Sequence, residues 1–176
     1  MRPHKKLRLL LFDANIVIKL HELGLLSRVV ETCEVTLASS VVGESQFVNQ
    51  GDERDYIDLQ AWVDNKVIKV VTMSLNDVTA FRAQFKPTYF DRLDVGEAES
   101  LAFLFKSGED YRIVSADTIV WKVLGATGRR EQGLSLEELL REAGETAQLD
   151  PQYTKAVRER WTKQGFDDHM TGSALK

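Results

Sequence analysis

The chain alternates between short, continuously apolar runs and longer segments in which apolar residues recur every three or four positions. The runs are rich in aliphatic and β-branched side chains, a pattern that predicts buried strands. These predicted strands occupy residues 7–12, 35–40, 66–73 and 111–117.

The segments between the strands have the periodicity of amphipathic helices. One helix is expected to begin at Ser39 or Ser40 and to run through Val48, where a polar turn at residues 50–55 follows it. The other predicted helices cover residues 16–30 (with a break near Gly24), 56–63, 78–85, 98–105, 120–124 and 135–144.

Strands that alternate with helices predict an α/β sandwich around a mostly parallel sheet. We expect this domain to span residues 1–145, with residues 146–176 forming a C-terminal helix and a frayed tail. That helix carries an apolar stripe, which is expected to pack back on the same domain rather than on a partner: Tyr153, Val157 and Trp161.

The charge balance argues against a protein that binds polyanions through its overall charge. The 176-residue chain has a formal net charge of -4, so it is not built as a whole to attract polyanions, and binding of nucleic acid would need local basic patches or a bound metal. The single cysteine, Cys33, excludes an intramolecular disulfide and fits a reducing cytoplasm. No apolar run is long enough for an export signal or a membrane span, so no membrane association is expected.

Acidic residues stand where the predicted strands end. Asp13 and Asp117 each follow or close a strand, and Glu44 and Glu97 fall near the starts of helices. Because ligands of open α/β sheets bind beyond the carboxyl ends of the strands, we expect these four carboxylates to meet at one edge of the sheet.

The chemistry of such a cluster favours a divalent cation. Carboxylates held close together repel one another, and a cation relieves that repulsion. Oxygen ligands without cysteine or clustered histidine favour Mg²⁺ or Mn²⁺. A carboxylate-bound Mg²⁺ suits phosphoryl chemistry, because the ion activates a water and stabilises the leaving oxygen.

Each acid also has a simpler interpretation. Asp13 and Asp117 are well suited to capping the helices that follow them. Glu97 and Glu99 lie in the first turn of a helix that Asp94 can cap, where acids are favoured by the helix dipole alone. Glu44, taken alone, is expected to be a solvated helix residue. The metal-site hypothesis therefore depends on the recurrence of acids at equivalent strand ends.

Four motifs follow one another along the chain: "LLFDANIVI", "SSVVGESQF", "LDVGEAESLAFLF" and "IVSADTIVWKVLGATG". In these motifs the sequence resembles the PIN-domain family, and within it the prokaryotic PIN-like ribonucleases related to VapC-type toxins. The resemblance covers roughly residues 7 to 143. Members of the family fold as three-layer α/β/α sandwiches with a mostly parallel central sheet and commonly act as Mg²⁺- or Mn²⁺-dependent ribonucleases.

The resemblance implies a role for each matching residue. The metal ligands it implies, which are also catalytic residues, are Asp13, Glu44, Glu97 and Asp117. Ser115 matches a hydroxyl residue that can hydrogen-bond a ligand or the attacking water, and Asn15, the polar neighbour of Asp13, is expected to bind substrate. Lys122 is expected to bind substrate for a different reason, since the substrate backbone needs positive charge near the acidic pocket; Lys19, Arg129 and Arg130 are further candidates. One turn of slippage in the alignment would exchange Glu97 for Glu99. The resemblance also implies a homodimer, an RNA substrate and an antitoxin partner in a toxin–antitoxin pair.

Two other functions stay open at this point. One is a PIN-like fold that serves as a binding or regulatory module with weak or no catalysis. The other is a phosphoryl-aspartate enzyme or receiver, for which "FDAN" supplies the acid at a strand end. A phosphatase of that kind needs a second aspartate two residues later, where this chain has Asn15.

Overall fold

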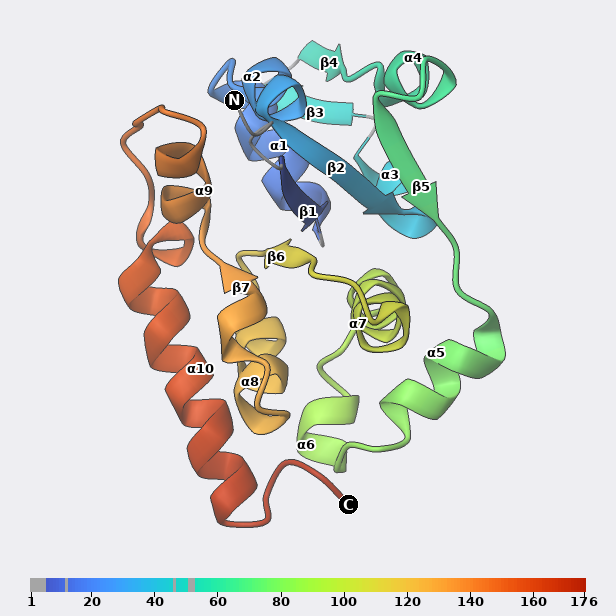
Figure 1. Ribbon diagram of the computed structural model, residues 1–176, viewed down its shortest axis with the longest axis vertical. Coiled ribbons are helices and arrows are strands. Elements are labelled where there is room, and N and C mark those ends of the chain that lie inside the picture. Colours follow the sequence, from blue (N-terminus) through green and yellow to red (C-terminus); the bar gives the residue numbers. More distant parts are fainter. Residues whose placement is uncertain (1–5, 12, 46, 51–52) are drawn as a thin grey trace, which may run out of the picture.

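The computed structural model describes residues 6–11, 13–45, 47–50 and 53–176. At positions 10, 11, 44, 47–50 and 53–55 it describes only the backbone. Five parallel strands form the central sheet (Figure 1). The strand order is β5-β2-β1-β6-β7. The strands are β1 (Leu7–Leu11), β2 (Cys33–Ala38), β5 (Ile68–Val71), β6 (Arg112–Val114) and β7 (Gly133–Leu134).

Helices cover both faces of the sheet, and each face has its own hydrophobic core. The predicted three-layer α/β/α sandwich with a parallel sheet is therefore confirmed. One face packs against α1 (Ala14–Glu22), α2 (Leu26–Thr32), α3 (Ser39–Glu44), α4 (Leu59–Asp64) and α9 (Leu136–Glu142). The other packs against α5 (Leu75–Arg82), α6 (Pro87–Phe90), α7 (Val95–Ser107) and α8 (Thr118–Ala126).

Helix ends follow the signals in the sequence. The break predicted at Gly24 separates α1 from α2, and this glycine has a φ of 67°. Gly108 ends α7 with a φ of 63°, a conformation that only glycine adopts without strain. Ser135 and Glu138 form the expected capping box of α9: Glu138 N donates to Ser135 Oγ (3.1 Å), and Ser135 N donates to the Glu138 carboxylate (2.9 Å).

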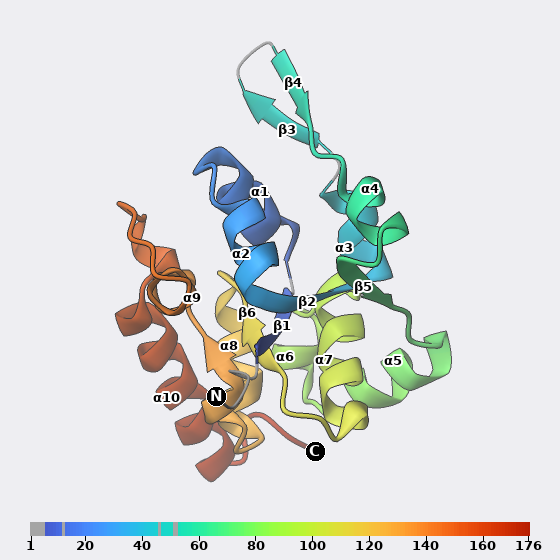
Figure 2. The same cartoon turned by 45° about the horizontal axis from the view of Figure 1, so that its top comes forward.

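The segment after β2 differs from its prediction. Helix α3 ends at Glu44 instead of continuing through Val48, and residues Phe47–Gln50 form strand β3. This strand pairs antiparallel with β4 (Glu53–Tyr56), so most of the predicted polar turn is strand. The hairpin projects away from the central sheet (Figure 2). Its stability comes from cross-strand pairing, which helical periodicity in a single segment does not reveal.

The C-terminal segment packs on the domain as expected. A 3-10 turn (Pro151–Tyr153) leads into α10 (Lys155–Met170), which lies along α8 (Figure 1). Gly125 and Gly165 permit this close contact: a Cβ at Gly125 would lie 1.9 Å from the Thr162 carbonyl oxygen, and one at Gly165 2.0 Å from the Lys122 carbonyl oxygen.

The last residues are more ordered than the frayed tail that the sequence predicted. Leu175 pairs with Phe85 in an antiparallel bridge. Lys176 N donates to the Gln84 carbonyl oxygen (3.0 Å), and Lys86 N donates to that of Ala174 (2.9 Å). These contacts attach residues 174–176 to the link between α5 and α6. The sequence prediction of a frayed tail did not include them, because they join segments far apart in the chain. In the part of the chain that is described, no helix has the length and apolar character to cross a membrane.

Candidate functional site

Two aspartates begin helices at the carboxyl edge of the sheet. Strands β1 and β6 are neighbours and run parallel, so the residues that follow them meet at one edge. Asp13 caps α1, and its Oδ1 accepts a hydrogen bond from Asn15 N (2.6 Å). Asp117 caps α8 in the same way and accepts from Ile119 N (2.9 Å). The capping role expected for both residues is therefore present.

Helix α7 brings two more acids to this edge through a reciprocal cap. Glu97 N donates to Asp94 Oδ1 (2.7 Å), and Asp94 N donates to Glu97 Oε2 (3.2 Å). This capping box fixes the Glu97 side chain. Glu97 is buried, with only 5% of its surface exposed to solvent. A glutamate this deeply buried normally has a cationic partner.

The four acids interact electrostatically, and we call Asp13, Asp94, Glu97 and Asp117 the acid group. Burial raises the pKa of Glu97 to about 8, and the charges of Asp117, Asp94 and Asp13 add to the rise. Burial also raises the pKa of Asp13, with further contributions from Asp117 and Asp94. No member of the acid group belongs to an ion pair found among the described residues.

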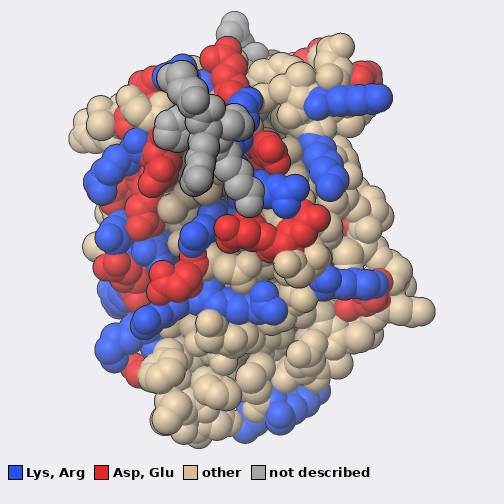
Figure 3. All heavy atoms as spheres, viewed as in Figure 1, with Lys and Arg blue, Asp and Glu red and all other residues tan. Residues whose placement is uncertain are grey.

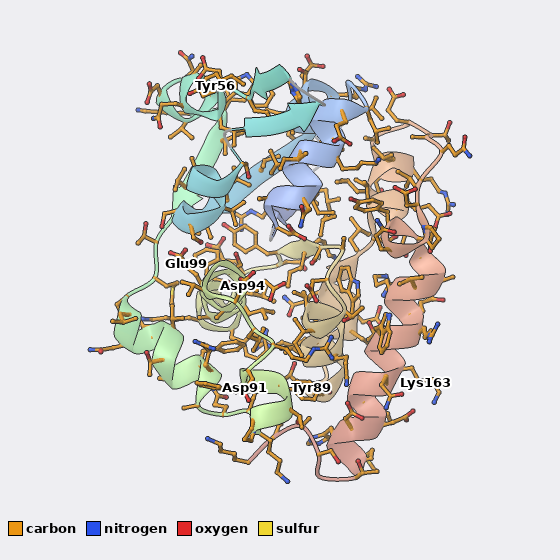
Figure 4. The ribbon with its side chains drawn as sticks, turned by 180° about the vertical axis from the view of Figure 1, so that it is seen from behind. Tyr56, Tyr89, Asp91, Asp94, Glu99 and Lys163 are labelled. Atoms are coloured by element: carbon orange, nitrogen blue, oxygen red, sulfur yellow. The ribbon has the colours of Figure 1, made fainter. Side chains whose placement is uncertain are left out.

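Glu99 has a different role from Glu97, although the two lie on the same helix. Its carboxylate accepts hydrogen bonds from Ser39 Oγ (3.1 Å), Ser40 Oγ (2.6 Å), Ser40 N (3.3 Å) and Met73 N (3.0 Å). Burial raises the pKa of Glu99, but these hydrogen bonds outweigh it and leave the pKa below its ordinary value. Figure 4 shows Glu99 on the side of α7 that faces α3. Glu97, not Glu99, therefore belongs to the acid group.

Two of the smaller predicted site residues also lie at this edge. Ser115 is fully buried, and its Oγ accepts a hydrogen bond from Asp117 N (2.9 Å), which orients the loop that carries Asp117. Asn15 is exposed, and both its backbone and its side chain donate toward Asp13. These bonds lower the pKa of Asp13 in opposition to burial.

Lys122 points elsewhere. Its Nζ lies 2.7 Å from Asp168 Oδ2 on α10 and 5.0 Å from the ring centroid of Tyr89. Both members of the ion pair are largely buried, with side-chain exposures of 15% and 17%. The structure thus uses Lys122 to hold α10 against α8 and does not bring it to the acid group.

Glu44, the remaining acid predicted from the sequence, ends α3. Its side chain lies outside the described part of the structure, so its distance to the acid group is not defined. Among the described side chains, no three of the histidine, cysteine, aspartate and glutamate type converge closely enough to share one metal ion. In the structure, the carboxylate of every member of the acid group takes part in a helix cap.

Asp94 is the member of the acid group that sequence reasoning assigned only to a cap. The signal was present, because Asp94 and Glu97 have the spacing of a capping box, and a capping box places two carboxyl groups side by side. Tyr153 was likewise interpreted only as part of an apolar stripe. In the structure its hydroxyl pKa is raised by burial and, more weakly, by the charge of Asp13, so the C-terminal segment reaches the same edge.

Positive and negative side chains are mixed on the face shown in Figure 3, and its lower part carries few charges. Lys19 lies 3.6 Å from both Glu22 and Asp150. Arg129 stacks on Phe105 and follows the end of α8 opposite to Asp117, as does Arg130.

No match to this chain was found among models of protein families, among curated proteins or among solved structures.

Proposed function

We propose that the protein is a Mg²⁺- or Mn²⁺-dependent nuclease, in the first instance a ribonuclease of the PIN-like kind. The observation that carries the proposal is the acid group: four carboxylates at the carboxyl edge of a parallel sheet, none of them in an ion pair found among the described residues, and a buried Glu97 whose pKa is raised to about 8. Such an arrangement is costly for a folded protein, and perturbed carboxylates gathered in one place are typical of functional sites.

The donor set fits a hard divalent cation. It consists of carboxylate oxygens, with the Ser115 hydroxyl and the Asn15 amide nearby, and Mg²⁺ and Mn²⁺ prefer such ligands. We propose Asp13, Glu97 and Asp117 as ligands, which requires their side chains to turn toward one another from the positions described above, and Glu44 from the resemblance of the sequence. A bound cation of this kind supplies an activated water and stabilises a leaving oxygen in phosphodiester hydrolysis.

The residues of the chain then have separate tasks. Asp13 and Asp117 hold the helices α1 and α8 in place by capping them, and a ligand role needs only the carboxylate oxygens left free by those caps. Glu97 retains a proton near neutral pH until a cation displaces it, because its pKa is about 8. Asp94 fixes Glu97 through the capping box.

The second candidate is a PIN-like binding or regulatory module. One observation favours it: every member of the acid group already caps a helix or completes a cap, so capping alone explains their positions. A binding module of this kind does not explain why the fold keeps a buried glutamate with a raised pKa at position 97. The homodimer, the antitoxin partner and the cytoplasmic location stay predictions from the sequence.

Cleavage of labelled RNA by the purified protein tests the proposal. We expect Mn²⁺-dependent cleavage that EDTA abolishes and that Asp117→Asn reduces by at least about a hundredfold, because one ligand is lost. Asparagine is as good a helix cap as aspartate, so this variant keeps its fold. The matched control is Asp58→Asn, which alters another N-cap aspartate, on α4 and outside the acid group, and keeps full activity. Absence of metal-dependent cleavage by the folded wild type would favour the binding module.

A further inference from the structure

Arg92 is a cationic side chain that the fold places beside the start of α8, close to the acid group. It lies in the link between α6 and α7, two residues before Asp94. Leu93, between them, is 2% exposed and belongs to the hydrophobic core under α7 and α8. The buried Leu93 and the helix cap at Asp94 both follow Arg92, and Arg92 N donates to the Tyr89 carbonyl oxygen (3.1 Å), so the backbone of this link is held by the fold on both sides of Arg92.

The guanidinium of Arg92 reaches across to the start of α8. Its Nη2 donates to Thr118 Oγ1 at 3.0 Å, and Thr118 directly follows Asp117. Arg92 therefore connects the link that precedes the cap of α7 with the first residue of α8, which is next in the chain to Asp117.

Most of the hydrogen-bonding capacity of Arg92 is unused. A guanidinium has five N–H donors, and the side chain makes one hydrogen bond to the described part of the chain. The residue is exposed and belongs to none of the ion pairs found among the described residues. A guanidinium close to the acid group that forms no ion pair with the described carboxylates keeps its donors available for another anion.

The other basic residues considered from the sequence do not fill this role. Lys122 is paired with Asp168, and Lys19 lies near two carboxylates and the Tyr153 ring. Arg129 and Arg130 follow the opposite end of α8. A nucleic-acid strand that approaches the acid group meets negative charge, so a cation at the edge of the site is needed to hold it.

We propose that Arg92 binds a phosphodiester group of the substrate strand beside the bond that is cleaved. The inference rests on the proposed nuclease function and adds the residue that recognises the backbone of the substrate. Arginine suits this contact, because its planar fork can bind two phosphate oxygens at once and it stays charged at every pH of interest.

Steady-state cleavage of a labelled oligoribonucleotide in Mn²⁺ tests this assignment, with Arg92→Gln compared with Arg130→Gln. Both variants remove one positive charge from an exposed side chain, but Arg130 follows the far end of α8 and pairs with Glu131. We expect KM to rise about tenfold in Arg92→Gln, with kcat little changed, and Arg130→Gln to match the wild type. The slope of log KM against log salt concentration is expected to fall by about one in Arg92→Gln. Arg92→Lys keeps the charge without the fork and should recover part of the loss.

The outcomes separate this inference from the proposed function. If the wild type cleaves and Arg92→Gln has the same KM and salt dependence as Arg130→Gln, the assignment of Arg92 is wrong and the nuclease function stands. A fall in kcat with unchanged KM would also overturn a role in binding. If the folded wild type does not cleave, both proposals fail.

Discussion

Replacing Glu97 by glutamine should make the metal-free protein more stable at alkaline pH. Glutamine can still accept the hydrogen bond from Asp94 N, so the capping box is kept. What the substitution removes is the negative charge of a carboxyl group that is 5% exposed and surrounded by Asp13, Asp94 and Asp117. The variant therefore isolates the electrostatic cost of the acid group.

The magnitude follows from the pKa of Glu97, which folding raises from 4.5 to about 8. Between these values the folded state keeps a proton that the unfolded state has released, so the contribution to stability is complete below about pH 4.5 and is lost as the pH rises toward 8. At about 1.4 kcal/mol for each pKa unit, the full cost of ionisation is about 4 to 5 kcal/mol. Since neighbouring carboxyls such as Asp13 share the repulsion, we expect a gain of about 2 kcal/mol for Glu97→Gln at pH 8.

Urea denaturation in EDTA at pH 5 and pH 8 measures this effect, and Glu99→Gln provides the matched comparison. The pKa of Glu99 is lowered, so its carboxylate stabilises the fold above its ordinary pKa, and that contribution is lost as the pH falls. Glu99→Gln should therefore cost about 2 kcal/mol at pH 8, because hydrogen bonds to a charged acceptor are weakened. At pH 8, Glu97→Gln should therefore raise the free energy of unfolding and Glu99→Gln should lower it. If Glu97→Gln were no more stable than the wild type at pH 8, the electrostatic account of the acid group would be refuted.

Two further predictions concern the contact between the C-terminal segment and the domain. Gly165→Ala should lower the free energy of unfolding by about 3 kcal/mol, measured by urea denaturation, because its Cβ would overlap the Lys122 backbone. Gly43→Ala, which meets nothing within 4 Å, is its control and should not destabilise the fold. Arg158→Ala should lower the free energy of unfolding by about 3 kcal/mol, measured by thermal or urea denaturation, because it leaves the largely buried Glu138 without its partner at 2.8 Å. If Arg158→Lys lost as much stability as Arg158→Ala, a role for the two hydrogen bonds from Arg158 to Glu138 would be contradicted.

Much of the site could be predicted from the sequence, because its positions are set by local signals. An aspartate after an apolar run marks both a strand end and a helix start, and neighbouring parallel strands then place Asp13 and Asp117 at one edge. The glycine and the apolar spacing of α7 placed Glu97 at the start of a helix. These features depend on residues within one turn or one strand.

What the sequence could not predict depends on contacts between distant segments. The hydrogen bonds that distinguish Glu99 from Glu97 come from Ser39, Ser40 and Met73, which lie far from Glu99 in the sequence. The β3–β4 hairpin and the two-residue strand β7 exist through pairing with another strand, for which a short segment carries little signal by itself. The position of Arg92 beside Thr118 likewise follows from the way α6, α7 and α8 pack together.

Binding of Mn²⁺ to the metal-free protein, followed by calorimetry at pH 7, tests the central claim most directly. We predict that the folded wild type binds Mn²⁺, that Asp13→Asn weakens binding by more than about tenfold, and that Asp58→Asn binds like the wild type. Proton release should accompany binding, because the cation displaces the proton of Glu97. Absence of Mn²⁺ binding by the wild type, or equal binding by Asp13→Asn, would contradict the claim that the acid group is a metal site.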